Sequence, residues 1–384
     1  MPLSYSGEPG IRQFLDTMAE RFGWDRKFEG ENVIGLVREG HSLTLEPAGQ
    51  IELSGSAFST IEQVVTEHQK YTKEITSVGD DLGISYCSAG IHPQWRREDM
   101  HWMPKGRYKI MREYLPTKGD LAIDMMTRTC GTQINLDFES EADMVRKMRV
   151  SIGLQPFLTA LFANSWQVEG KDTGYTSYRS HIWKDTDPDR CGILPFVFEK
   201  GMSFERYVDY VLDVPMFFIV RNGEMINMAG KSFRAFANGD LPESRVHTPT
   251  MQDWFDHMST TFPEVRLKTF IELRGTDSVP PPLVYAIASF WVGLLYDDQA
   301  LKQASDFIAD WSIDDHWSFR NTVAKDGLNT KVPRSSMMIR DIAPEILDIA
   351  AQGLSRQPGQ NYGLVYLDDL RKRLQIQDKQ TLCQ

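Results

Sequence analysis

Three short stretches of the sequence could bring oxygen-rich side chains to one surface. In each stretch polar residues alternate with apolar ones, which is the pattern of a β-strand with one face in a core. The polar positions hold Glu46 and Glu52, Gln133 and Asn135, and Glu272 and Arg274. Carboxylate and amide oxygens suit Mg²⁺, and Mg²⁺ together with arginines can hold the phosphates of ATP. If the three strands are neighbours in one antiparallel sheet, we expect a metal- and phosphate-binding floor.

Each stretch also has a simpler interpretation. A polar row on an isolated strand is more often a plain hydrophilic face than a site. No Lys or Arg separates Glu46 from Glu52, so these repelling carboxylates form either a cation-binding pair or a solvated acidic edge. Glu272 beside Arg274 would ordinarily be interpreted as a surface ion pair. The residues alone lead no further than a metal- and phosphate-binding sheet.

Other kinds of site are not supported by the sequence. There is no P-loop and no Gly-x-Gly-x-x-Gly run, so a common nucleotide-binding fold is not expected. The four cysteines are scattered and form no Cys-x-x-Cys pair, which argues against structural zinc and a disulfide scaffold and fits a reducing cytoplasm. The net charge of −11 is unlike that of a nucleic-acid-binding protein. A site for anionic small molecules must therefore gather its arginines or metal ions locally.

The size of the chain permits one large domain or two ordinary ones. Its 384 residues are 41% hydrophobic and 25% charged, which is enough for a large core. No apolar run approaches about 18 residues, so no transmembrane helix is expected, and the N-terminus lacks the pattern of a signal peptide. Without repeats or low-complexity linkers, we expect one catalytic domain over residues 1–384. We expect a cytoplasmic monomer or homodimer that binds neither nucleic acid nor membranes.

Periodicity predicts the elements that must position the polar side chains. The central element is a strand within residues 125–138, whose Ile134, Leu136 and Phe138 enter the core. Amphipathic helices are predicted over residues 11–22 and 57–78, hairpins over 32–45 and 216–228, and helical structure from about residue 297 to the end.

Several long motifs resemble those of one known family. They lie in residues 45–55 (LEPAGQIELSG), 103–108 (MPKGRY), 124–130, 133–138, 163–165, 179–183 (RSHIW), 194–198, 262–268 (FPEVRLK) and 290–296. In these motifs the chain resembles the glutamate–cysteine ligases of the plant and proteobacterial type. The motifs occur in the same order as in that family, and the resemblance covers nearly the whole chain.

The resemblance implies an α+β protein with a glutamine-synthetase-like fold. Helices would pack on one side of a curved antiparallel sheet, and residues 297–384 would form a mainly helical C-terminal part. The implied reaction is the first step of glutathione biosynthesis. ATP phosphorylates the γ-carboxylate of L-glutamate, and the α-amine of L-cysteine attacks the acyl phosphate to give γ-glutamylcysteine. ATP is then a substrate and Mg²⁺ the cofactor.

The resemblance also implies roles for individual residues. The expected Mg²⁺ ligands are Glu46, Glu52, Gln133 and Glu272. The expected catalytic residues are Arg274, Glu272 and Asn135. The expected substrate-binding residues are Arg107, Arg179, Arg128 and Thr129. Arg274 would neutralise the charge of ATP phosphates, and Asn135 would position metal or phosphate. Arg107 and Arg179 would grip the carboxylates of glutamate, for which a bidentate guanidinium fits better than lysine.

One departure from the family leads to a second hypothesis. Family members begin with a Gly-x-Glu-x-Glu strand, whereas residues 1–5 here resemble the loop after that strand. The chain would then be an inactive or truncated relative that acts as a binding or regulatory protein. A third hypothesis is a carboxylate–amine ligase with another acceptor, because the acceptor amine rests on the resemblance alone.

Overall fold

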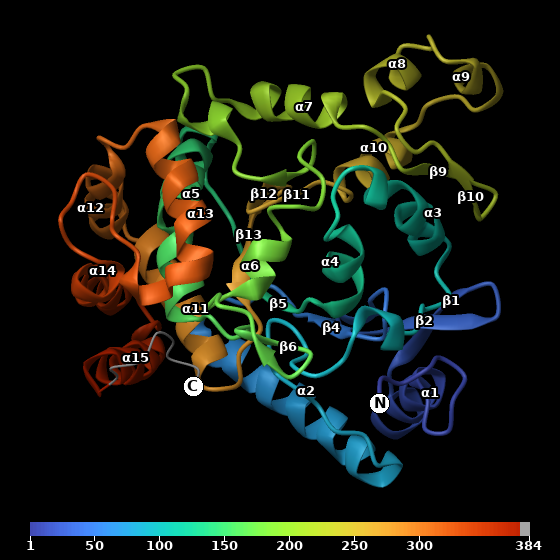
Figure 1. Ribbon diagram of the computed structural model, residues 1–384, viewed down its shortest axis with the longest axis horizontal. Coiled ribbons are helices and arrows are strands. Elements are labelled where there is room, and N and C mark those ends of the chain that lie inside the picture. The colour runs from blue at the N-terminus through green and yellow to red at the C-terminus, as the bar shows by residue number, and fades with distance from the viewer. Residues whose placement is uncertain (377–384) are drawn as a thin grey trace.

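The computed structural model describes residues 1–376 and has mixed α+β architecture with antiparallel strands, as predicted (Figure 1). The N-terminal part forms a four-stranded sheet in the order β1-β2-β3-β4. Its strands are β1 (Asp25–Glu29), β2 (Asn32–Arg38), β3 (His41–Leu45) and β4 (Ile51–Ser54). Helix α1 (Ile11–Phe22) has the predicted bounds and packs its apolar side on β2. The hairpin predicted over residues 32–45 is confirmed, and the polar stretch that holds Glu52 forms β4.

A second antiparallel sheet lies at the centre of the molecule, in the order β12-β13-β5. Its strands are β12 (Val265–Leu267), β13 (Ile271–Asp277) and β5 (Gly131–Leu136). Helices α5 (Glu141–Leu161) and α11 (Leu283–Leu295) pack against this sheet. Leu136, Ile271 and Leu273 are buried in the core that these helices share. The alternation therefore leaves the polar side chains of β5 and β13 on the opposite face.

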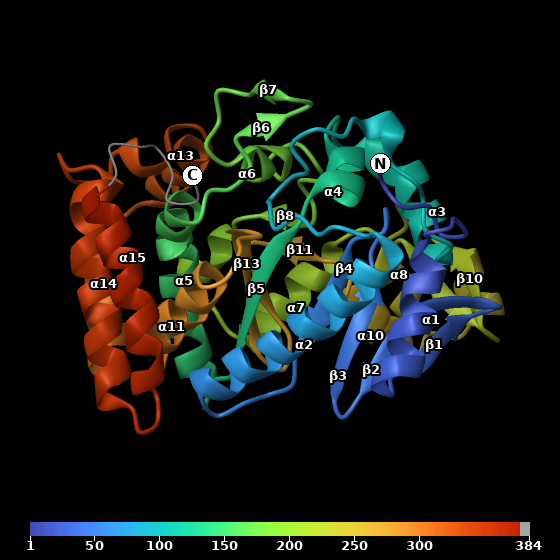
Figure 2. The same ribbon diagram turned by 90° about the horizontal axis from the view of Figure 1, so that it is seen from below.

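The single sheet predicted to join all three polar stretches is not what the structure has. β4 ends the N-terminal sheet and β5 ends the central sheet, and no backbone pairing connects them within residues 1–376. Each strand finds its hydrogen-bonding partner elsewhere, β4 with β3 and β5 with β13. The long helix α2 (Ile61–Leu82) contacts both α1 and α11 and so links the two parts (Figure 2).

The predicted central strand begins later than its sequence suggested. Residues 122–128 form helix α4 (Ala122–Arg128), and β5 starts at Gly131. Met125 and Met126 belong to this helix and are buried, and Asp124 forms an ion pair with Arg128 four residues later. The predicted alternation is confirmed within β5, where Leu136 is buried and Ile134 packs against the same core.

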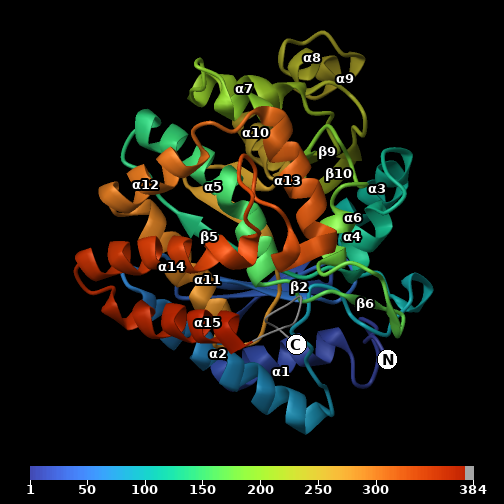
Figure 3. The ribbon, with the colours of Figure 1, turned by 60° about the vertical axis from the view of Figure 1, so that its left-hand side comes forward.

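The remaining elements are small sheets and helices. The short strands are β6 (Gln167–Val168), β7 (Lys171–Asp172), β8 (Cys191–Gly192), β9 (Phe218–Arg221), β10 (Glu224–Asn227) and β11 (Phe262–Pro263). The other helices are α3 (Gly106–Tyr114), α6 (Tyr178–Ile182), α7 (Phe204–Asp213), α8 (Phe233–Ala237), α9 (Pro242–Val246), α10 (Met251–Met258), α12 (Asp298–Ile308), α13 (Ile313–Asp326), α14 (Ile339–Arg356) and α15 (Leu364–Ile376). The predicted helical C-terminal part is confirmed as far as residue 376, with α14 and α15 packed on α11 (Figure 3). Residues 377–384, which include Cys383, lie outside the described part.

The core is divided into two large apolar clusters. One surrounds the central sheet with α5, α11 and the C-terminal helices, and the other joins α1 and the N-terminal sheet to α3 and α4. Among the described helices, none is long and apolar enough to cross a membrane.

Candidate functional site

A row of polar side chains crosses the central sheet on the face opposite α5 and α11. Arg266 of β12 lies directly across from Glu272 of β13, which in turn lies directly across from Asn135 of β5. Residues that are direct partners in an antiparallel pair project from the same face of the sheet. Arg274, two residues after Glu272, projects to that face as well.

Three cationic side chains converge on the carboxylate of Glu272. Arg266 Nε donates to Oε2 at 2.6 Å, Arg274 Nη1 to Oε2 at 2.7 Å, and Lys268 Nζ to Oε1 at 3.2 Å. Burial by itself would raise the pKa of Glu272, but the three cations together hold it well below its usual range. Three positive groups thus contact one carboxylate, and the Glu52 carboxylate acts on Arg266 and Arg274 without forming an ion pair with either. Such a concentration of cations suits an anionic ligand.

A small cavity, which we call the arginine cavity, lies beside this cluster and shares Arg274 with it. It is lined by Arg179, Ser180, Trp183, Gly192, Phe262, Pro263, Glu264, Arg274, Gly275 and Arg320. Three of its hydrogen-bond donors are buried and find no acceptor among residues 1–376. They are Arg179 Nε, Trp183 Nε1 and Arg320 Nη2. Since buried donors normally have acceptors, this cavity is suited to an acceptor-rich group such as a carboxylate.

The guanidinium of Arg179 is held in place from several sides. Its Nη2 donates to the carbonyl oxygen of Arg274 at 3.0 Å, and its Nη1 lies 4.0 Å from Asp277 Oδ1. Asp277 is buried at the end of β13 and accepts hydrogen bonds from Ser165 Oγ at 2.6 Å and Ser177 Oγ at 2.9 Å. Ser177 caps α6, the short helix that carries Arg179. Asp277 therefore positions Arg179 both directly and through the start of its helix.

The close approach of Arg179 to the sheet depends on Gly131. A Cβ atom added at this first residue of β5 would lie 2.5 Å from Arg179 Nη2. Any larger side chain would push the guanidinium away from the arginine cavity.

Comparison with known proteins shows which family shares this chain's sequence. The model of "Glutamate-cysteine ligase family 2 (GCS2)" matches residues 1–358. The chain belongs to the glutamate–cysteine ligase family.

Relatives with the same name are similar over most of the chain. Glutamate–cysteine ligase B, chloroplastic, of Oryza sativa subsp. japonica is 48% identical over 355 residues, which are 92% of this chain and 71% of the relative. The chloroplastic glutamate–cysteine ligase of Arabidopsis thaliana is 47% identical over 347 residues, which are 90% of this chain and 66% of the relative. One solved structure, the Pup ligase PafA in complex with ADP, has a TM-score of 0.36 and 11% identity over 94% of this chain and 62% of that chain.

These findings confirm the family and the ligase class predicted from the motifs. They also correct one prediction. The relatives are named chloroplastic, so the prediction of a cytoplasmic location is wrong.

The predicted Mg²⁺ ligands of this glutamate–cysteine ligase family member do not form a ready metal site. Glu272 is fully engaged by Arg266, Lys268 and Arg274. Within residues 1–376, no group of three or more His, Cys, Asp or Glu side chains is placed to hold a metal ion. The residues present therefore do not fit Mg²⁺ as the structure holds them, and the cofactor stays a prediction from the sequence.

The other predicted ligands lie around the charged row. Glu52 projects from β4 within electrostatic reach of Glu272 and Arg274, although its strand belongs to the other sheet. Crowding by protein atoms and the nearby Glu46 carboxylate raise the pKa of Glu52, even though solvent still reaches the side chain. Gln133 lies two residues before Asn135 on the same face of β5. Asn135 thus lies across from Glu272 and Glu52 reaches it electrostatically from the other sheet, while their roles as ligands stay predictions.

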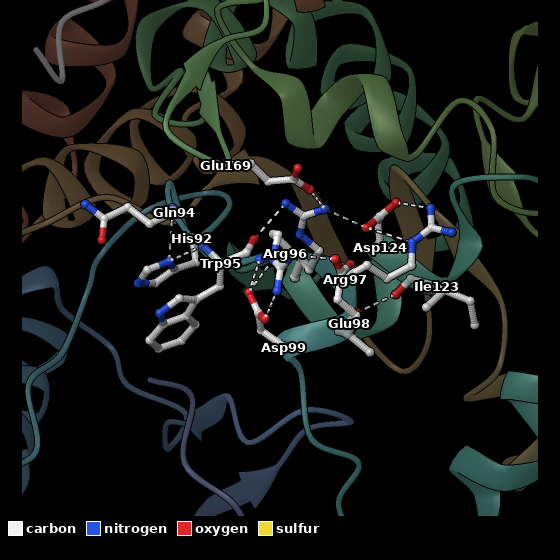
Figure 4. A network of polar contacts seen from close by, with 12 residues as sticks. His92, Gln94, Trp95, Arg96, Arg97, Glu98, Asp99, Ile123, Asp124 and Glu169 are labelled. Carbon is white, nitrogen blue, oxygen red and sulfur yellow. Dashed lines mark hydrogen bonds and ion pairs between the residues drawn. The ribbon is translucent and has the colours of Figure 1, made fainter.

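Two of the predicted substrate-binding residues are committed to contacts within the protein. The buried Arg128 pairs with Asp124 at 3.0 Å and Glu169 at 3.3 Å, and its Nη2 donates to the carbonyl oxygen of Trp95 at 2.8 Å. Figure 4 shows Asp124 and Glu169 in this network. Neither Arg128 nor these two partners line the arginine cavity. The hydroxyl of Thr129 donates to the carbonyl oxygen of Met125 at 2.7 Å and closes the end of α4. Both side chains are therefore occupied by contacts within the protein, and neither lines the arginine cavity.

Arg107 lies near the start of α3, apart from the residues that line the arginine cavity. Its guanidinium carbon is 5.5 Å from the centre of the Phe218 ring, and its buried Nε has no acceptor among the described residues. The helix is anchored to β3 by Lys105 and Tyr108, which both donate to the carbonyl oxygen of Leu45. Arg107 thus has donors for a ligand, but from a different element than Arg179.

The sequence analysis missed several side chains that the structure brings to the site. They are Glu264, Arg266, Lys268, Asp277, Trp183 and Arg320. Arg266 and Lys268 had a signal, because they continue the alternation of the third polar stretch. Arg320 had none, since it lies in a helix more than forty residues beyond that stretch.

Proposed function

We propose that this protein joins the γ-carboxylate of L-glutamate to the α-amine of L-cysteine at the expense of ATP. ATP transfers its γ-phosphoryl group to an oxygen of the γ-carboxylate, which gives ADP and γ-glutamyl phosphate. The cysteine amine then forms a C–N bond to the acyl carbon while the C–O bond to phosphate breaks. γ-Glutamylcysteine and inorganic phosphate are the products, and the amine loses one proton. Family membership and the names of the relatives support this assignment.

The observation that carries the proposal is the convergence of cations at the central sheet. Arg266, Lys268 and Arg274 surround one carboxylate in a chain whose net charge is −11. The arginine cavity adds two further arginines next to this cluster. All three proposed substrates carry carboxylate or phosphate groups. In the transition state of phosphoryl transfer, negative charge is spread over the oxygens of the transferred group. Fixed cations at such a place lower the free energy of that state.

We assign complementary roles to the two parts of this site. Arg274 would face the phosphates, since its guanidinium belongs to the cationic cluster and also lines the arginine cavity. Arg179 would bind a carboxylate of glutamate, because a guanidinium pairs well with planar oxygen pairs. Asn135, directly across from Glu272, would position a phosphate oxygen through its amide. The central antiparallel sheet with helices on one face supports a glutamine-synthetase-like fold.

The decisive experiment follows an oxygen atom through the reaction. L-Glutamate labelled with ¹⁸O in the γ-carboxylate is incubated with ATP, a magnesium salt, L-cysteine and the purified chain. If γ-glutamyl phosphate forms, one ¹⁸O atom per turnover appears in the inorganic phosphate, and mass spectrometry detects γ-glutamylcysteine. Release of ADP without label in the phosphate would contradict the acyl-phosphate route.

Two control reactions separate the remaining hypotheses. Omitting L-cysteine should leave little phosphate release, and replacing it by L-2-aminobutyrate tests whether the acceptor must carry a thiol. If the folded chain binds L-glutamate but forms no product with any amine, it acts as a binding protein and the proposed reaction is wrong.

A further inference from the structure

The ion pair between Glu264 and Arg320 forms one wall of the arginine cavity. Arg320 comes from α13, and Glu264 lies between β11 and β12. Arg320 Nε donates to Glu264 Oε1. Both side chains are largely enclosed, with exposed fractions of 4% for Arg320 and 14% for Glu264. An enclosed pair of opposite charges, next to an arginine-rich surface, can recognise a ligand that itself carries both charges.

The backbone around this pair is fixed by neighbouring elements. Glu264 N donates to the carbonyl oxygen of Gly192 at 2.9 Å, and the carbonyl oxygen of Glu264 accepts from Arg274 N at 2.9 Å. Helix α13 packs on α6, and the carbonyl oxygen of Ala324 accepts from the backbone of Thr176 and Ser177 at the start of α6. Arg320 is therefore held against the short helix that carries Arg179 and ends at Trp183.

One end of each partner remains available to a ligand. Arg320 Nη2 is buried and finds no hydrogen-bond acceptor within residues 1–376. The second oxygen of Glu264 has no protein donor in that part of the chain. The available N–H group of Arg320 can bind an anion, whereas the available oxygen of Glu264 can bind a cation. An α-amino acid presents both groups on adjacent atoms, as an α-carboxylate and an α-ammonium.

We propose that Arg320 and Glu264 are specificity-determining residues that recognise the α-carboxylate and the α-ammonium of L-glutamate, respectively. This inference rests on the proposed function, since that reaction makes glutamate the substrate. Arg179 and the indole N–H of Trp183 supply further donors for the same carboxylate. The γ-carboxylate then points towards Arg274 and the cationic cluster, where phosphoryl transfer takes place.

Two analogues of glutamate test the two contacts separately, and direct binding is measured by calorimetry without ATP. 4-Aminobutyrate lacks the α-carboxylate and glutarate lacks the α-ammonium, while both keep the terminal carboxylate. The wild-type chain should bind L-glutamate at least about 100-fold more tightly than either analogue, because a site built for a polar group rejects a ligand that lacks it.

The variants should change selectivity in opposite ways. Arg320→Gln should reduce the preference for L-glutamate over 4-aminobutyrate about tenfold or more and leave the preference over glutarate largely intact. Glu264→Gln should reduce the preference over glutarate instead. Lys325→Gln, on the same helix but at an exposed position, is the matched control and should change neither ratio.

A purely structural ion pair would give a different result. Both variants would then weaken all three ligands by the same factor, and this outcome would overturn the inference. An equal loss of affinity for inorganic phosphate and for L-glutamate in Arg320→Gln would also overturn it, because Arg320 would then belong to a phosphate site. If Arg320→Gln does not fold, Arg320→Lys keeps a cation beside Glu264 but loses the planar donor pair, and its selectivity should still fall.

The binding assay also separates this inference from the proposed function. If L-glutamate binds with the expected selectivity but no γ-glutamylcysteine forms, the reaction is wrong and the recognition site stands. If γ-glutamylcysteine forms while both variants keep wild-type selectivity, the reaction stands and the inference is wrong.

Discussion

Glu272 is the direct cross-strand partner of Asn135 in the central sheet. Within residues 1–376, Arg266, Lys268 and Arg274 each form an ion pair with the Glu272 carboxylate and with no other acidic side chain. A buried charge that loses its partners is strongly destabilising, because desolvation is no longer compensated. Removing the negative charge of Glu272 should therefore lower the stability of the fold.

Glu272→Gln should destabilise the fold because it leaves Arg266, Lys268 and Arg274 to repel one another. We expect the free energy of unfolding to fall by about 3 kcal/mol, measured by urea denaturation. Added sulfate should restore more stability to this variant than to the wild type, since an anion can replace the lost carboxylate. Asp298→Asn, at a side chain that is 92% exposed, is the control. Equal stabilisation of the variant and the wild type by sulfate would argue against a cationic anion site.

Gly131→Ala should displace the guanidinium of Arg179, because the two atoms nearest to the new Cβ belong to that guanidinium and the next is the carbonyl oxygen of Thr276 at 3.0 Å. The KM for L-glutamate should rise about tenfold or more, since small displacements of a positioning group are costly, and the melting temperature should change little. Gly201→Ala is the matched control, because a Cβ there meets no atom within 4 Å. An unchanged KM in Gly131→Ala would remove Arg179 from the glutamate site.

Arg128→Gln should act on stability and not on substrate binding. The variant leaves the buried Asp124 with fewer donors and removes the hydrogen bond to Trp95, so we expect a loss of about 2 kcal/mol in unfolding free energy. The KM values for glutamate, cysteine and ATP should stay within about twofold of the wild type once the variant is folded. A large rise in one KM would restore Arg128 to the substrate-binding residues that its motif predicted.

Acidification should destabilise the protein through two buried histidines. Burial lowers the pKa of His257 and of His316 from 6.5 to about 4, so between these values the unfolded chain binds more protons than the folded chain. The stability from these neutral imidazoles is therefore complete above pH 6.5 and is lost as the pH falls towards 4.

The measurement for this prediction is the unfolding free energy as a function of pH. His316→Gln should have a shallower slope between pH 6.5 and 4 than the wild type. His101→Gln, which replaces an exposed imidazole, should keep the wild-type slope. A slope for His316→Gln equal to that of the wild type would show that His316 does not titrate in this way.

The sequence by itself determined which residues share a face and which family the chain belongs to. Alternation in β5 and β13 predicted that Asn135, Glu272 and Arg274 lie on the face away from Ile271 and Leu273, because successive residues of a strand point to opposite sides. The spacing of apolar residues likewise predicted α1 and the helical C-terminal part, since a 3.6-residue period is a local property of the chain. The collinear motifs predicted the ligase family, which the comparisons confirm.

Only the tertiary structure decided which of these faces meet and what each charge pairs with. β5 pairs with β13, more than a hundred positions away, whereas β4 pairs with its sequence neighbour β3. Local periodicity carries no information about the partner, so it could not show that β4 and β5 belong to different sheets. The ion pairs that occupy Arg128 and surround Glu272 likewise depend on the long-range packing of separate segments. Arg320 lines the arginine cavity because α13 packs on α6, a contact between distant segments of the chain.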